Sequence, residues 1–283
     1  INQSGDTRFP RLSPDGKRVV VERRPMQGCV GCSDLWIIDL ERGTNTPFTD
    51  GAGDELGGIW SPDGGSIAYR ANPDGMFALF RKATTGVAKE EPLLKMDREI
   101  TGLTDWSHDG KYLLFTANEP NNGNDLWYLP LSEDRKPQLL LQTKFNESTA
   151  RFSYDGRWVA YQSNKSGTSQ IYVIPFPAAS QVVPISIDGG SNPRWRQDGK
   201  ELLFTKQEDR SLMAVEIKVT GTTLEAGTPR RLFQYPVGNV TFATTPNADR
   251  FLWAAVPGTL TQAASAGDTP LTVVLNWTAD LKQ

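Results

Sequence analysis

The chain has 283 residues, of which 38% are hydrophobic, 10% aromatic and 22% charged, and its formal net charge is -3. This apolar content is sufficient for a large buried core and excludes a disordered chain. Because acidic and basic residues are scattered along the chain, the sequence shows no basic surface for nucleic acid. All apolar runs fall short of the roughly 20 residues that a membrane-spanning helix needs, so we expect no membrane insertion by this segment.

One short phrase recurs six times and divides the chain into repeats. Its copies begin at Leu12, Trp60, Trp106, Phe152, Trp195 and, in a decayed form, Thr244. The first five copies contain an Asp-Gly pair, which is typical of a tight hairpin turn because glycine accepts a positive φ without a steric clash. Successive copies lie about 43 to 49 residues apart, which is the length of one four-stranded propeller blade.

Segments rich in β-branched and aromatic residues follow each turn and predict strands. In chain order they are 19–21, 34–38 and 46–49; 67–69, 78–80 and 92–94; 112–115, 125–129 and 138–141; 158–161, 170–174 and 183–186; 202–204, 212–215 and 230–233; and 251–253 and 271–275. A segment before each turn supplies a further strand. We find no helical periodicity of useful length.

These repeats predict an all-β fold in which residues 1–283 form a single domain, a six-bladed β-propeller of four-stranded antiparallel blades. The sixth repeat has no evident fourth strand, whereas residues 1–3 lie where such a strand would precede the first turn. We therefore expect the N- and C-terminal segments to pair and close the ring, because a closed ring leaves no long sheet edge exposed. We expect this propeller to be a monomer.

The turn Trp60-Ser61-Pro62-Asp63-Gly64, an aliphatic strand after it, and the Asp-Leu-Trp strands at 34–36 and 125–127 resemble the repeat of TolB-like propellers, which are relatives of WD repeats. The resemblance covers essentially the whole chain. It implies a non-catalytic module that binds a protein partner or ligand, on the periplasmic or extracytoplasmic side.

Three later segments, 189–195, 212–215 and 272–277, resemble the C-terminal propellers of bacterial Ser/Thr protein kinases. This resemblance implies a sensor domain that lies outside the cytoplasm and belongs to a larger signalling protein. The kinase motifs are absent from this sequence, so kinase activity would belong to another portion. Because the chain begins at Ile1 rather than at a methionine, we expect it to be a trimmed or processed piece.

Cys29 and Cys32 are the only cysteines and lie in the loop between the second and third strands of the first repeat. A structural zinc site needs two further ligands, and the one histidine, His108, belongs to the turn of the third repeat. A thioredoxin-like redox site needs a βαβ context, which this chain lacks. The alternatives are a local disulfide, which fits an oxidising compartment, and a pair of free thiols; we expect no metal site.

Arginine recurs just before the turn phrase, at Arg11, Arg151 and Arg194, and Asp105 takes the same position in the third repeat. A planar guanidinium fork suits an anion or carboxylate clamp. The structural alternative is that each arginine pairs with a turn aspartate or with backbone carbonyls and locks neighbouring blades together.

The loops that enter the inner strands carry a set of polar and charged side chains. They are Asp6, Arg8, Asp54, Glu55, Arg98, Glu99, Asn146, Glu147, Ser191 and Asn192. In a propeller such loops surround one mouth of the central channel, and a scaffold that holds its loops in place favours function there. We predict the ligand or partner surface on this set together with Arg11, Arg151 and Arg194. The alternative is an ordinary solvated surface.

Enzymatic interpretations find little support in the residues. The turn aspartates Asp15, Asp63, Asp109, Asp155 and Asp198 recur in equivalent turns and are expected to accept local backbone N–H groups. The chain has no Gly-x-Ser-x-Gly elbow and no Ser/His/Asp or Cys/His constellation. We therefore expect a protein that is not an enzyme and needs no cofactor.

One enzymatic alternative remains, a calcium-dependent, lactonase-like hydrolase. Calcium is a hard cation that prefers oxygen ligands. Such an enzyme would have to use Glu55, Glu99, Asn146 and Glu147 at the channel mouth.

Overall fold

The computed structural model describes residues 6–24, 33–85, 89–119, 123–235, 238–255 and 271–275. Within these ranges every regular element is a β-strand, and no helix there is long and apolar enough to cross a membrane. Cys29, Cys32 and residues 1–3 lie outside the described residues. The disulfide and the closing strand pair are therefore not described.

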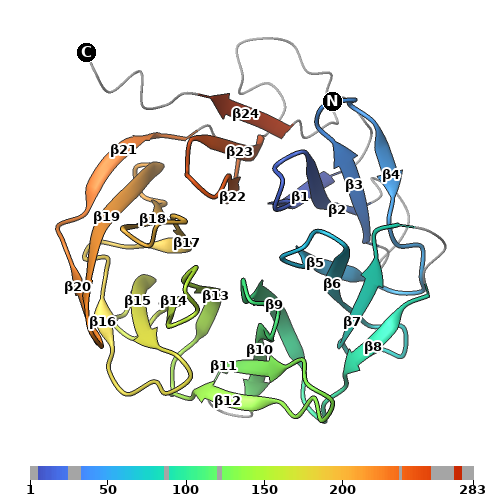
Figure 1. Ribbon diagram of the computed structural model, residues 1–283, viewed down its shortest axis with the longest axis horizontal. Helices are drawn as coiled ribbons and strands as arrows, with labels where there is room; N and C mark the ends of the chain where they lie inside the picture. The colour runs from blue at the N-terminus through green and yellow to red at the C-terminus, as the bar shows by residue number, and fades with distance from the viewer. Residues whose placement is uncertain are drawn as a thin grey trace. The chain divides into compact units, whose positions relative to one another are not determined.

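Consecutive strands lie side by side in antiparallel sheets (Figure 1). The first three sheets comprise β1 (Asp6–Leu12), β2 (Arg18–Arg24), β3 (Asp34–Asp39) and β4 (Asn45–Pro47); β5 (Glu55–Trp60), β6 (Ser66–Ala71), β7 (Ala78–Ala83) and β8 (Glu91–Leu94); and β9 (Ile100–Trp106), β10 (Tyr112–Glu119), β11 (Gly123–Pro130) and β12 (Gln138–Leu141). The others comprise β13 (Glu147–Phe152), β14 (Trp158–Ser163), β15 (Gln170–Pro175) and β16 (Val183–Pro184); β17 (Ser191–Trp195), β18 (Glu201–Lys206), β19 (Ser211–Thr220), β20 (Thr223–Ala226) and β21 (Arg230–Gln234); and β22 (Gly238–Thr244), β23 (Arg250–Ala255) and β24 (Leu271–Leu275).

The prediction of six four-stranded blades is wrong. The chain forms five complete blades, of which four have four strands and the fifth has five, and the described residues after them form a three-stranded sheet of β22, β23 and β24. The fifth blade gains a strand because β19 continues for ten residues and pairs with β21 at its start and with β20 at its end. Among the described strands, β1 pairs with β2 and β24 pairs with β23.

The chain divides into two compact units. The first spans 1–103, 236–245 and 249–283, and it contains the first two sheets, most of β9 and the three-stranded sheet. The second spans 104–235 and 246–248 and contains the sheets from β10 to β21. The single domain over residues 1–283 stays a prediction.

The Asp-Gly turns form as the sequence predicts. In the first repeat, the backbone N of Gly16 donates to Ser13 O at 2.8 Å, and Asp15 Oδ1 accepts from Lys17 N at 3.1 Å. Gly16 has a φ of 69°, which side chains disfavour. The hydrogen bond from Ser13 holds the pKa of Asp15 below its usual value. These aspartates are therefore turn residues.

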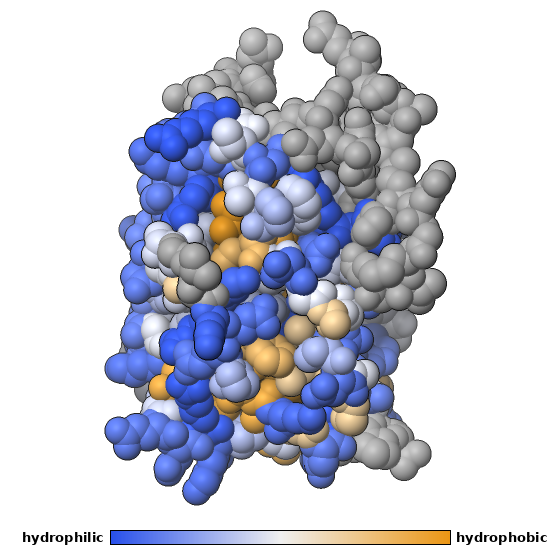
Figure 2. All heavy atoms as spheres, turned by 90° about the vertical axis from the view of Figure 1, so that its right-hand side faces the viewer, coloured by the Kyte–Doolittle hydropathy of each residue, from blue (hydrophilic) through white to orange (hydrophobic). Residues whose placement is uncertain are grey.

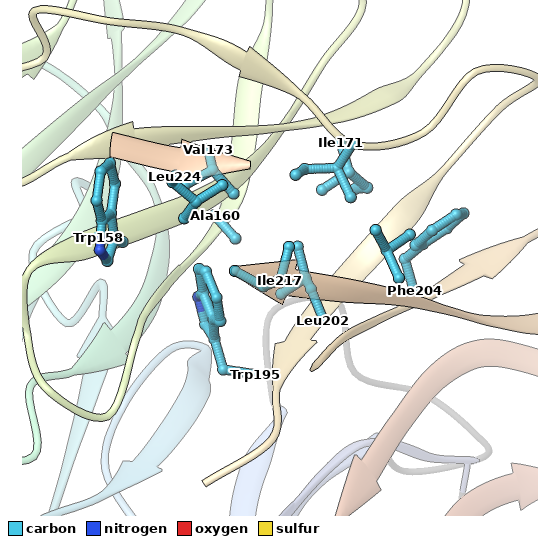
Figure 3. Close-up of a cluster of buried hydrophobic side chains, with 11 residues drawn as sticks. Trp158, Ala160, Ile171, Val173, Trp195, Leu202, Phe204, Ile217 and Leu224 are labelled. Carbon is cyan, nitrogen blue, oxygen red and sulfur yellow. The ribbon is translucent and has the colours of Figure 1, made fainter. Parts of the chain in front are cut away.

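Tryptophans that recur before and after the turns pack between neighbouring sheets. In the second unit, Trp158 of β14 and Trp195 of β17 belong to one buried cluster. Figure 3 shows side chains of β14 and β15 together with Leu224 of β20, facing side chains of β17, β18 and β19. Their burial supplies the main stabilising contribution between these two sheets.

Candidate binding site

The inner strands of the first two sheets each contain a bulge. In β1 the register passes from Arg8 opposite Glu22 to Arg11 opposite Val20, and Phe9 between them has a φ of 51°. A bulge leaves one residue unpaired and redirects the side chains beside it. Arg8 therefore lies opposite Glu22, and Arg11 follows directly after the bulge.

The second sheet repeats this arrangement with an arginine in place of the glutamate. In β5 the register passes from Leu56 opposite Arg70 to Ile59 opposite Ala68, and Gly57 in the bulge has a φ of 70°. Glu22 and Arg70 therefore occupy equivalent positions on the second strands of neighbouring sheets.

Both charged side chains reach from their own sheet to the next inner strand. Glu22 Oε1 accepts a hydrogen bond from the backbone N of Gly57 at 2.6 Å. Arg70 Nη1 donates to the carbonyl O of Ile100 on β9 at 3.1 Å. The Arg70 guanidinium also lies over the Phe77 ring, 4.2 Å from its centroid, which favours a cation–π interaction.

Three arginines act on the single carboxyl of Glu22. Burial raises the pKa of Glu22 to about 7, while the hydrogen bond from Gly57 and the charges of Arg70, Arg11 and Arg8 act in the opposite direction. Burial lowers the pKa of Arg70. We name Arg8, Arg11, Glu22 and Arg70 the arginine–glutamate cluster. Its chemistry suits the recognition of an anion or carboxylate, because guanidinium groups form bidentate pairs with carboxylates.

Of the other predicted site residues in the first unit, two act on this cluster through their charges and two have other surroundings. The charges of Asp54 and Glu99 act on Arg70, and Asp54 Oδ1 also accepts from Ser33 N at 2.9 Å. Arg98 forms an ion pair with Asp97 at 3.3 Å. Glu55 is buried, with 2% of its surface exposed.

The predicted site residues of the second unit are buried or form hydrogen bonds with backbone groups. Glu147 is fully buried, and Asn146 Oδ1 accepts from Asn124 N at 3.1 Å. Arg151 is buried, and its Nη1 donates to the carbonyl of Ala150 at 3.0 Å. Arg194 donates to its neighbouring Pro193 carbonyl at 2.8 Å. Of the remaining residues in the predicted set, Ser191 and Asn192 are buried and Asp6 has no described side chain.

Sequence reasoning did not identify Glu22 and Arg70 as site residues, although the repeats contain a signal for them. Each second strand of the first five repeats has three consecutive apolar residues followed by a polar or charged one. These residues are Glu22, Arg70, Thr116, Gln162 and Thr205. Of these five residues, only Glu22 and Arg70 carry a charge.

The described residues do not assemble a metal centre. Among them, no three His, Cys, Asp or Glu side chains lie together in a way that would hold a metal ion. His108 instead stacks on Tyr154, with ring centroids 3.6 Å apart, and burial lowers its pKa.

A second surface feature lies on the outer strands of the second sheet. Met76, Phe80 and Leu93 line a shallow groove of about 360 Å³, and the pair formed by Lys95 and Asp74 lies at its edge, 3.5 Å apart. Figure 2 looks onto this side of Figure 1 and shows apolar patches among hydrophilic side chains.

Residues 97–255, more than half of the chain, match the family model described as the TolB beta propeller domain. Among solved structures, the chain is similar to TolB from Acinetobacter baumannii, with 18% identity and a TM-score of 0.66 over 90% of this chain and 59% of that one. It is also similar to a putative TolB from Agrobacterium tumefaciens, with 20% identity and a TM-score of 0.62 over 80% of this chain and 81% of that one.

An enzyme is also among the similar structures. An oligogalacturonate lyase in complex with manganese shows 14% identity and a TM-score of 0.63 over 95% of this chain and 73% of that one. At such identities, structural likeness shows the fold alone. A search of curated proteins gave no match, and the chain spans 59% of the length of the Acinetobacter structure.

Proposed function

The chain belongs to the TolB beta propeller domain family, and on this premise we propose that it is a non-catalytic binding module that recognises a carboxylate-bearing segment of a protein partner through Arg8, Arg11 and Arg70. The observation that carries the proposal is that these three guanidinium groups act on one carboxyl, that of Glu22. A fold alone does not determine function, so the proposal rests on this cluster.

Glu22 occupies the position that a ligand carboxylate would take. With its pKa of about 7, Glu22 is largely protonated below neutral pH, and its negative charge at the cluster is then lost. An incoming carboxylate supplies that charge in its place. We therefore expect the affinity for an anionic segment to rise as the pH falls from 8 to 6, provided that the ligand carboxylate stays ionised.

The test is the binding of two matched hexapeptides, one with three glutamates and one with three glutamines in their place, measured by isothermal titration calorimetry. We expect the glutamate peptide to bind more tightly. Charge-assisted hydrogen bonds contribute about 1.5–3 kcal/mol, so Arg11→Ala should weaken binding roughly tenfold. Arg8→Ala should weaken it less, because Arg8 is exposed.

Arg42→Ala is the matched control, since Arg42 is also exposed and lies in the loop between β3 and β4. It removes the same charge from the protein without touching the cluster, so it should leave the affinity unchanged. Equal binding of the two peptides, or an Arg11→Ala variant that binds like the wild type, would contradict the proposed function.

We further propose that the module is a sensor within a larger signalling protein and that it lies on the extracytoplasmic side. The resemblance of 189–195, 212–215 and 272–277 to kinase-linked propellers supports the first part, and family membership supports the second. Protease treatment of intact spheroplasts tests the location. Cleavage of the module before lysis is expected, and cleavage only after lysis would contradict it.

The calcium-dependent hydrolase is the second functional alternative, and no observation favours it. Glu55 and Glu147 are buried in different units, and the described acidic side chains form no metal-binding group. The similarity to oligogalacturonate lyase concerns the fold.

A further inference from the structure

The first and second sheets meet at a short backbone junction that is separate from the arginine–glutamate cluster. The backbone N of Glu55, at the start of β5, donates to Ser33 O at 2.7 Å. Ser33 N in turn donates to Asp54 Oδ1 at 2.9 Å. Asp34 begins β3 directly after Ser33, so the first residues of β3 and β5 lie together at this junction.

The junction buries the Glu55 carboxyl beside that of Asp34. Glu55 is 2% exposed, and its Oε2 has no hydrogen-bond donor among the described residues. Thr49 and Asp34 are both within hydrogen-bonding reach of the Glu55 side chain. The backbone at Gly51 packs so closely that an added Cβ would lie 2.2 Å from Glu55 Oε1. Ionising the buried Glu55 carboxyl beside a second carboxylate carries a large cost.

The titratable groups around the pair do not offset this cost. The charges that act on Asp34 and Glu55 are those of Asp50, Asp54 and Glu90, all of them negative. The neighbouring Tyr69 is fully buried, and burial together with Glu90 raises its pKa above the usual value. Two arginines of β2 lie beside the junction: Arg23 is the cross-strand partner of Asp34, and Arg24 Nε donates to Ser33 Oγ at 3.4 Å.

A junction of the same design in the second unit shows what satisfies such a carboxylate. Glu147 accepts from Thr143 Oγ1 and from Ser163 Oγ, both at 2.9 Å. Asp125, which is equivalent to Asp34, accepts from Gln142 Nε2 at 3.2 Å. The positive charge of Lys165 also acts on Glu147. Glu147 therefore has donors for its ionised form, whereas Oε2 of Glu55 has none among the described residues.

We propose that Asp34 and Glu55 hold one shared proton and that its loss weakens the junction between β3 and β5, so that the first two sheets form a pH-sensitive region. Burial raises the pKa of Glu55 to about 7 and also raises that of Asp34. The closed junction therefore binds a proton that an opened junction releases. Between the ordinary glutamate pKa and pH 7, the junction loses stability as the pH rises, and above pH 7 this loss levels off.

Hydrogen exchange of the wild-type protein tests this proposal. Peptides that cover the starts of β3 and β5 are followed between pH 5 and pH 8, and their rates are corrected for intrinsic exchange. Because one proton is involved, the population of the opened junction rises by up to about tenfold per pH unit between the ordinary glutamate pKa and pH 7. We expect at least tenfold more opening at pH 8 than at pH 5 in these peptides. Protection that does not change with pH there would overturn the proposal.

Three variants separate this pair from other groups. Glu55→Gln should remove the pH dependence, because an amide can donate to ionised Asp34. Glu147→Gln is the matched control in the second unit and should leave the β3 and β5 response unchanged. Glu22→Gln should also preserve that response, although Glu22 contacts β5 through Gly57. A pH dependence that survives in Glu55→Gln, or that disappears in Glu22→Gln alone, would overturn the assignment to Asp34 and Glu55.

A measurement on the wild type keeps the proposal testable if Glu55→Gln does not fold. Carbon-13 NMR of labelled glutamate side chains reports the titration of Glu55, with Asp34→Asn used for assignment. A midpoint close to 7 is expected. A midpoint at or below the ordinary glutamate value of about 4.3 would show that no proton is shared.

Discussion

The two units place different chemistry at the same position of the repeat. In the first unit the residue after the apolar triplet is Glu22 or Arg70, and each bonds to the backbone of the next inner strand. In the second unit Gln162 donates to Ser169 Oγ at 3.1 Å, and Thr205 donates to Ser191 O at 3.0 Å. The neutral residues bond locally, whereas the charged ones reach beyond their own sheet.

The carboxylates between sheets differ in the same direction. Glu147 of the second unit accepts from two hydroxyls, whereas Glu55 of the first unit lies beside Thr49 and Asp34, and its Oε2 has no donor among the described residues. Burial raises the pKa of both glutamates, so the two differ in their hydrogen-bond donors rather than in the direction of the pKa shift. The hydrogen bonds to Glu147 stabilise its ionised form, whereas one oxygen of Glu55 has no such donor among the described residues.

The largest effect that we expect comes from the core of the second unit. Trp195 is buried in the cluster between the fourth and fifth sheets, and its Nε1 donates to Arg151 O at 3.2 Å. Trp195→Ala should lower the free energy of unfolding by about 3–5 kcal/mol, as measured by urea denaturation. Leu139→Ala is the control, since Leu139 is 43% exposed and should change stability by less than about 0.5 kcal/mol. A loss in Trp195→Ala of under about 1 kcal/mol would contradict this prediction.

The second effect is a difference in sign between two equivalent glutamates. At pH 8, Glu147→Gln should destabilise the protein by about 1–3 kcal/mol, because the variant loses bonds between an ionised carboxylate and its donors. Glu55→Gln should instead stabilise it at pH 8, because it removes a buried charge, and this gain should disappear at pH 5. Urea denaturation at both pH values measures the free energy of unfolding of the two variants. Changes of the same sign in both variants at pH 8 would contradict this prediction.

The sequence predicts the scaffold better than it predicts the site. The Asp-Gly turns and the strands that follow them depend on local residue choice, so Gly16 and Asp15 could be interpreted without tertiary information. The extra strand of the fifth blade was missed because Thr220-Gly221-Thr222 forms a tight hairpin within what we expected to be a loop, and Gly221 has a φ of 61°. The sixth repeat lacks an evident fourth strand in the sequence, and its described residues form a three-stranded sheet.

The burial of the acidic residues lay beyond sequence reasoning. Glu55 and Glu147 were expected on a channel mouth because polar loop residues are usually solvated. Their burial depends on the segments that pack over them from neighbouring sheets, such as the backbone at Gly51. The hydrogen-bond donor to Glu22 is a backbone amide in the next sheet, and the sequence around Glu22 does not predict this hydrogen bond.

A smaller effect is expected at the arginine–glutamate cluster. Glu22→Gln removes the internal carboxylate, so the glutamate hexapeptide should bind a few-fold more tightly at pH 8, and the pH dependence of binding should be lost. Gln162→Glu, the converse change at the equivalent position of the second unit, should leave binding unchanged. Titration calorimetry at pH 6 and pH 8 measures peptide binding by both variants. Weaker binding by Glu22→Gln at pH 8 would contradict the proposal that a ligand carboxylate takes the position of the Glu22 carboxylate.

The smallest effect is expected where the two units are alike, in their turns. Asp63 accepts from Gly65 N at 3.0 Å in the first unit, and Asp155 accepts from Arg157 N at 3.2 Å in the second. Hydrogen bonds lower the pKa of both aspartates, so this stabilisation is present at neutral pH and is lost as the pH falls through their folded-state pKa values. Asp155 also pairs with the Arg157 side chain at 2.7 Å, but an exposed pair adds little.

Asp63→Ala and Asp155→Ala should therefore each lower the free energy of unfolding by about 1 kcal/mol at pH 7, as measured by urea denaturation, and their effects should add in the double variant because the turns lie in separate repeats. A difference of more than about 1 kcal/mol between the single variants would mean that the turns are not equivalent scaffold. The contrast between the units would then extend beyond the positions that carry charge, and the first unit could no longer be distinguished by its cluster and its acid pair alone.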